Sequence, residues 1–93
     1  MAPSLDRTDT AILARAIDPS QGNLTEAAAR SILNIGLTPT DCSRRDELAE
    51  KARQGTLSPE ELSELESYRH VGRILEMMKA KARVSLTKAD LAS

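Results

Sequence analysis

The sequence of 93 residues contains no phenylalanine and no tryptophan, and Tyr68 is its single aromatic residue. Aromatic side chains bury large areas, so a core without them is built from aliphatic residues and stays thin for the length of the chain. Proteins that bind single-stranded nucleic acids stack the bases on aromatic rings. The composition therefore argues against that recognition mode, and it predicts a fold whose stability is marginal or depends on a partner.

Cysteine and histidine each occur once, as Cys42 and His70. One cysteine cannot form an internal disulfide, and structural zinc takes four ligands drawn mainly from these two residue types. A catalytic Cys/His pair would need a contact between distant segments and a third orienting group, for which the sequence gives no candidate. The sequence also lacks a Glu-x-x-His pair, a phosphate-binding glycine loop and a calcium-loop pattern. We therefore expect a protein that is not an enzyme, with no metal or other cofactor and no small-molecule substrate.

The sequence has no apolar run near the roughly 18 residues that a membrane-spanning helix needs. Residues 1–13 carry Asp6 and Asp9 and lack the basic and then apolar plan of a signal peptide. With 40% hydrophobic and 29% charged residues, the composition is close to that of ordinary globular domains. These features predict a folded cytoplasmic protein without a membrane partner.

Glycine and proline divide the chain into four stretches with helical features. The first, residues 5–17, places apolar side chains near one face and stops at Asp18-Pro19, because the residue before a proline disfavours the helical conformation. The second begins after Asn23 or Thr25 and ends at Gly36, which is placed to adopt the left-handed conformation. Both stretches are short.

The third stretch opens at Thr38-Pro39 or at Thr40-Asp41 and runs to Gln54, with Gly55 directly after it. Lys51 lies in its final turn, where a positive charge suits the negative end of the helix dipole. Few apolar residues are available along this stretch, so most of the helix is expected to face water.

The fourth stretch has the strongest helix start in the chain, Ser58-Pro59-Glu60-Glu61. It combines an N-cap serine, a proline at the first helical position and a glutamate that can bond back to the cap, while Leu57 and Leu62 form a hydrophobic staple. Helical spacing of apolar residues then holds to Ala82, so the helix is long. Because the connection after Gly55 is short, we expect it to form an antiparallel hairpin with the third helix.

The predicted fold class is therefore all-α: a small bundle of about four helices in a single domain, 1–93, with residues 1–4 and 87–93 frayed. Gly72 lies inside the long helix and costs about 1 kcal/mol relative to alanine. Two interpretations stay open for it, namely close approach of another helix or a mild weak point.

Charge is distributed unevenly along the chain, with a local net of −4 over residues 41–66 and +5 over residues 69–88. Two interpretations are open. The gradient can complement the dipole of the long helix, or the basic half of that helix can form a strip that faces an anion. The overall charge of −1 does not favour a dedicated nucleic-acid binder. The basic residues in question are Arg69, Arg73, Lys79, Lys81 and Arg83.

The long helix is apolar on more than one side near Leu75, because Ile74 and Met77 flank its main stripe. Methionines at helical spacing are usually core residues, but they also suit an adaptable partner groove. Our leading hypothesis is that this surface, rimmed by the basic residues, docks on a protein partner or on a second copy. The predicted partner-binding residues are Tyr68, Val71, Ile74, Leu75, Met77 and Met78.

Several stretches also carry a resemblance to a known family: residues Ala14 to Pro19, Glu47 to Arg53, Gly55 to Glu61, Val71 to Leu75 and Lys81 to Leu86. In these stretches the chain resembles a family of small uncharacterised helical bacterial proteins of the planctomycete type. That family is associated with HNH-type nuclease genes, so the resemblance implies a small accessory or antitoxin-like partner and no activity of its own. The alternative from a different class is a regulatory protein that contacts nucleic acid through the basic half of the last helix.

Overall fold

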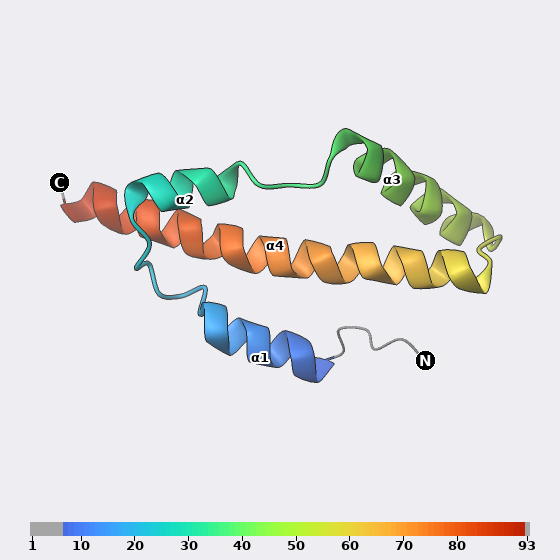
Figure 1. Ribbon diagram of the computed structural model, residues 1–93, viewed down its shortest axis with the longest axis horizontal. Coiled ribbons are helices and arrows are strands. Elements are labelled where there is room, and N and C mark those ends of the chain that lie inside the picture. The colour runs from blue at the N-terminus through green and yellow to red at the C-terminus, as the bar shows by residue number, and fades with distance from the viewer. Residues whose placement is uncertain (1–6, 93) are drawn as a thin grey trace. The chain divides into compact units, whose positions relative to one another are not determined.

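The computed structural model describes residues 7–92, and these residues form four α-helices and no strand. Figure 1 shows them in chain order as α1 (Arg7–Ile17), α2 (Glu26–Leu33), α3 (Pro39–Gln54) and α4 (Pro59–Ala92). The predicted all-α class, with a long last helix, is confirmed. Residues 1–4, which we expected to be frayed, lie outside the described residues. No helix in the described part of the chain combines the length and the apolar character needed to cross a membrane.

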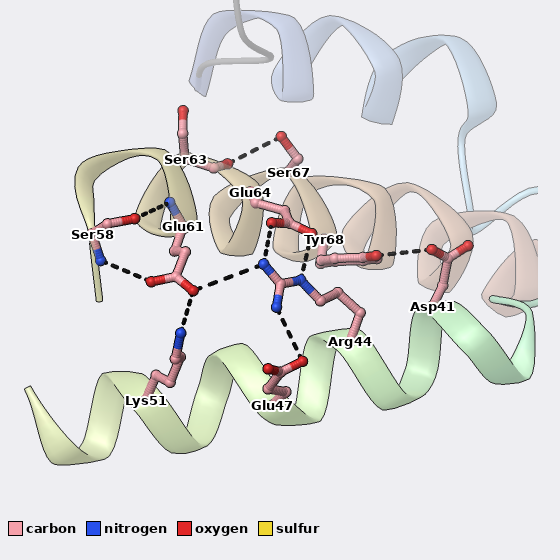
Figure 2. A network of polar contacts seen from close by, with 10 residues as sticks. All are labelled: Asp41, Arg44, Glu47, Lys51, Ser58, Glu61, Ser63, Glu64, Ser67 and Tyr68. Carbon is pink, nitrogen blue, oxygen red and sulfur yellow. Dashed lines mark hydrogen bonds and ion pairs between the residues drawn. The ribbon is translucent and has the colours of Figure 1, made fainter. Parts of the chain in front are cut away.

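The starts of three helices follow from local hydrogen bonding. Of the caps considered, Thr25 and Thr38 are used: the hydroxyl of Thr25 accepts the N–H of Ala28 at 3.2 Å, and that of Thr38 accepts the N–H of Asp41 at 3.1 Å. At α4 the predicted capping box is present in both directions (Figure 2). The Ser58 N–H donates to Glu61 Oε1 at 3.0 Å, and the Glu61 N–H donates to Ser58 Oγ at 3.1 Å.

The ends of the helices agree with the sequence at α1 and α3 and differ at α2. Gly55 has a φ of 71° after α3, and Asp18 has a φ of 50° after α1, where proline follows. The prediction that Gly36 ends the second helix in the left-handed conformation is wrong. The helix stops earlier, at Leu33, and Asn34 caps it in a right-handed conformation. The Asn34 N–H donates to the Ser31 carbonyl at 3.1 Å, and the Ile35 N–H donates to the Ile32 carbonyl at 3.0 Å.

The last helix continues through Ala92, whereas we expected a frayed end from residue 87. Ser85 is 3% exposed and Ala89 is half-buried, so packing continues beyond the apolar stripe seen in the sequence. The Thr87 hydroxyl also donates to the Arg83 carbonyl at 3.0 Å within this segment.

The contacts of the chain divide it into two compact units. One contains α1, α2 and the part of α4 from Arg73 onward, and the other runs from Leu37 to Gly72. In the described residues the buried apolar side chains are few, and Leu48 is the largest that is fully buried. They are Ala29 and Ala82 in the first unit and Leu48 and Leu65 in the second.

The unit from Leu37 to Gly72 is the predicted antiparallel hairpin of α3 and the start of α4. Side chains early in α3 contact residues late in this part of α4, and side chains late in α3 contact its beginning (Figure 2). The pairs that set this register are Asp41 with Tyr68, Arg44 with Glu64, and Lys51 with Glu61.

In the other unit, the loop between α1 and α2 packs closely on α4. The N–H of Leu24 donates to Ser85 Oγ at 3.1 Å, and Lys81 Nζ donates to the Asp18 carbonyl at 3.4 Å. A Cβ placed on Gly22 would come within 2.9 Å of Val84 Cγ1 and 3.0 Å of the Ser85 nitrogen. Glycine is therefore required at Gly22 by the close approach of the loop to the helix.

Gly72 differs from Gly22 in this respect. A Cβ placed on it would have no heavy atom within 4 Å among the described residues outside its own helical surroundings. Close approach of another helix, one of the two interpretations of Gly72, is not what the structure shows there. The remaining interpretation is a local weak point in the long helix.

Candidate interaction surface

Four of the six predicted partner-binding residues lie on one face of α4. Val71, Ile74, Leu75 and Met78 are spaced as i, i+3, i+4 and i+7, which places them in one stripe. Val71 is 41% exposed, and the other three are half-buried. Met77 lies beside the stripe and is also half-buried. The surface is therefore partly open to solvent, and most open at Val71.

Tyr68, which we also predicted to bind a partner, holds the hairpin together. Its hydroxyl donates to Asp41 Oδ1 at 2.8 Å, and this hydrogen bond raises the pKa of the phenol above its ordinary value. The other oxygen of Asp41 accepts the Thr38 hydroxyl at 3.0 Å, so the carboxylate is fixed at the start of α3. Tyr68 is therefore not part of the docking surface, because its polar end is engaged within its own unit.

The residues of the predicted basic rim differ in the contacts that they make. Arg69 and Arg73 are exposed, and no ion pair holds either of them among residues 7–92. Arg83 lies 3.7 Å from Glu76, and both side chains are more than half exposed, so this pair contributes little. Lys79 is half-buried, and Lys81 faces the end of α1. Arg69 and Arg73 are the members of the rim most available to an anion.

A polar network that the sequence did not reveal joins α3 to α4. The Arg44 guanidinium donates to both oxygens of Glu64 at 2.9 Å and to Glu47 at 3.0 Å, and it lies 3.8 Å from Glu61 (Figure 2). Lys51 Nζ donates to the second oxygen of Glu61. Bidentate pairing of this kind fixes geometry as well as adding energy.

The network shifts the acidity of its members. The Lys51 ammonium, helped by the backbone N–H of Ser58, lowers the pKa of Glu61 from 4.5 to about 2. Hydrogen bonds from Arg44 lower the pKa of Glu64, and those to Glu64 and Glu47 raise the pKa of Arg44. Glu61 has two tasks, since one oxygen closes the capping box and the other binds α3.

From the sequence, the acids at the start of α4 were explained by the helix dipole and, for Glu61, by the capping box with Ser58. The hairpin register supplies the further reason, because it brings Glu61 and Glu64 opposite the basic residues of α3. Aligning the two helices around the Ser58 capping box could have found these pairs. Leu57 and Leu62, predicted as a staple, line one hollow of about 540 Å³ at the turn of the hairpin, and Leu62 is 44% exposed.

Cys42 and His70 are both half-buried in the hairpin unit. The Cys42 thiol lies 3.9 Å from the Leu37 carbonyl, and no hydrogen bond joins it to His70 in the described part of the chain. Among residues 7–92, three or more His, Cys, Asp or Glu side chains nowhere gather in a way that could hold a metal ion. That the protein is not an enzyme and has no cofactor stays a prediction.

Comparison of the chain with protein-family models, with curated proteins and with solved structures gives no match. The resemblance to the planctomycete-type family therefore stays a hypothesis.

Proposed function

We propose that the chain is a cytoplasmic, non-enzymatic interaction module that docks on another protein through α4. The observation that carries this proposal is the balance of buried and exposed apolar side chains. The described residues bury few apolar side chains, while on α4 Val71 is 41% exposed and Ile74, Leu75, Met77 and Met78 are only half-buried. Burial of apolar surface contributes about 25 cal/mol per Å², so a partner that covers this surface would add stability that the isolated chain lacks.

The docking surface that we propose is centred on Val71 and Ile74, with Met77 beside them. Methionine adapts to irregular partner surfaces, and an apolar centre with a polar rim is the usual anatomy of a protein interface. The exposed Arg69 and Arg73 form the basic part of that rim. They favour a partner whose complementary surface is acidic, because opposite potentials across an interface fix orientation and speed association.

An accessory or antitoxin-like role is the biological form of this proposal. It is supported by the resemblance to small companions of HNH-type nucleases and not by any contact in the structure. The partner would then be such a nuclease, and the α4 surface would be covered in the complex.

Capture of a partner from the source cells tests the proposal. Ile74→Glu and Met77→Glu place a charge in the apolar centre and should abolish capture, while circular dichroism should show that both variants keep the wild-type helix content. Leu91→Glu is the matched control, because Leu91 is an 81% exposed apolar residue of the same helix outside the proposed surface. Equal capture by the wild type and by Ile74→Glu would rule the surface out.

A second candidate function rests on the exposed Arg69 and Arg73, which could contact a nucleic-acid backbone. Each phosphate neutralised by the protein releases counterions, so two such contacts would lower the affinity about tenfold between about 50 and 200 mM salt. A salt-dependent affinity that Arg69→Gln and Arg73→Gln both weaken would favour this function. Binding that does not change with salt would exclude it.

A further inference from the structure

A hollow of about 340 Å³ lies in the unit formed by α1, α2 and the later part of α4. This volume is at the lower end of the range for small-molecule sites, so it suits one small ligand. The sequence predicted no such site, because its walls come from three helices and a loop that are far apart in the chain. Its apolar walls are Ala16, Ile17, Leu24, Ile32 and Met78.

The polar side chains at this hollow are Lys81 and Asn23. Lys81 is half-buried, and no carboxylate among residues 7–92 forms an ion pair with it. Its ammonium group donates to the Asp18 carbonyl at 3.4 Å, which is longer than a typical hydrogen bond. One oxygen of the Asp18 carboxylate accepts the Ser20 hydroxyl at 2.7 Å, and neither oxygen forms an ion pair with Lys81. Since an ammonium group has three donors, Lys81 keeps two for an anion.

We propose that this hollow binds a small amphipathic monoanion, namely a carboxylate with a medium-length alkyl chain. The carboxylate would accept hydrogen bonds from Lys81, and the amide of Asn23 could add another. The alkyl chain would lie against Ile17, Ile32 and Met78 and would gain van der Waals contacts with them. A positive group beside an otherwise apolar wall selects this combination of charge and chain.

Titration of the full-length protein with octanoate, followed by nuclear magnetic resonance of its methyl groups, tests the proposal. The methyl signals of Ile17, Ile32 and Met78 should shift and saturate, and the exposed Leu91 should not respond. Acetate, which has the charge without the chain, and octanol, which has the chain without the charge, should bind at least about tenfold more weakly. The loss of one charge-assisted hydrogen bond corresponds to that factor or more.

Two lysines of the same helix make a matched pair for this test. Lys81→Met should weaken octanoate binding at least about tenfold, and Lys81→Arg should largely keep it. Lys79→Met removes a half-buried lysine that does not line the hollow and should bind octanoate like the wild type. If Lys81→Met unfolds the chain, Ala16→Leu fills the hollow from α1 and should block binding while Lys81 stays in place.

Three results would overturn the proposal. One is the absence of any saturable shift at the methyl groups of the hollow. Another is equal binding of octanoate and octanol, which would mean an apolar hollow without a role for Lys81. The third is shifts of similar size at Leu91 and Ile12. Such shifts would mean that octanoate adsorbs to exposed apolar side chains or causes the chain to associate with a second copy.

Discussion

Ser85 Oγ accepts the backbone N–H of Leu24 at 3.1 Å and so ties the loop after α1 to a buried position on α4. The same hydroxyl donates to the Lys81 carbonyl at 2.8 Å, so both of its hydrogen-bonding functions are satisfied inside the protein. Ser85 is 3% exposed, and its hydroxyl is the acceptor of this loop N–H. A polar residue in an apolar stripe thereby fixes the path of the loop.

Ser85→Ala should lower the free energy of unfolding by about 1–3 kcal/mol, because the Leu24 N–H loses its partner. Ser67→Ala is the matched control. Ser67 also donates to the carbonyl four residues earlier, at 3.1 Å, but it is exposed and accepts no loop N–H. The control should stay within about 0.5 kcal/mol of the wild type in urea unfolding. Equal effects of the two substitutions would contradict the role given to Ser85.

Substitution of two glycines by alanine should change the stability of the protein in opposite directions. Gly22→Ala should destabilise the protein by about 1–3 kcal/mol, because the new Cβ meets the backbone nitrogen of Ser85, which cannot move aside cheaply. Gly72→Ala should stabilise it by up to about 1 kcal/mol, because the added methyl group has room and alanine favours the helix. Thermal melts of both variants test this, and a stabilising Gly22→Ala would show that the loop does not pack on α4 as described.

Tyr68 should titrate above its ordinary pKa of 10.0 in the folded protein, because the Asp41 carboxylate accepts its proton in a hydrogen bond. The folded pKa is raised, so the stabilisation is complete below 10.0 and is lost as the pH rises through the higher folded value. Ultraviolet absorbance of the phenolate reports this residue alone, since it is the single tyrosine.

Asp41→Asn should bring the Tyr68 titration back toward its ordinary value. Asp46→Asn, which removes an exposed carboxylate of the same helix that does not contact Tyr68, should leave the titration where it is in the wild type. An unchanged titration in Asp41→Asn would show that the hydrogen bond does not form in solution.

The hairpin should weaken in acid through Glu61. The pKa of Glu61 is lowered to about 2 in the folded protein, so its contribution to stability is present above 4.5 and is lost as the pH falls from 4.5 toward about 2. Urea unfolding across this range, followed by circular dichroism, should show a steeper loss for the wild type than for Glu61→Gln. Glu60→Gln, an exposed neighbour, should behave like the wild type. If the free energy of unfolding falls with pH in parallel for Glu61→Gln and the wild type, Glu61 does not cause the loss of stability in acid.

The sequence predicted the start of α4 from local capping chemistry, but it placed the end of α2 at the wrong residue. Ser58 and Glu61 are three residues apart, so their reciprocal bonds could be expected from the sequence. The C-cap of α2 is Asn34 and not Gly36. The sequence did not predict this, because an asparagine cap in a right-handed conformation leaves no clear pattern in the sequence.

The candidate surface was predictable only in part. The spacing of Val71, Ile74, Leu75 and Met78 on one face follows from helical periodicity. The engagement of Tyr68 with Asp41 and of Lys81 with Asp18 depends on which segments meet, and periodicity carries no information about that. For the same reason, the close packing of Gly22 against α4 could not be read from a loop that contains several turn-forming residues.

In the proposed function, the apolar surface of α4 is available to a different protein. The most direct test is the mass in solution by light scattering, measured with the circular dichroism melt over a wide range of protein concentrations. We predict a mass of 10.1 kDa and a melting midpoint that does not change with concentration. A multiple of that mass, with a midpoint that rises with concentration, would contradict it, because the surface would then be covered by a second copy of the chain.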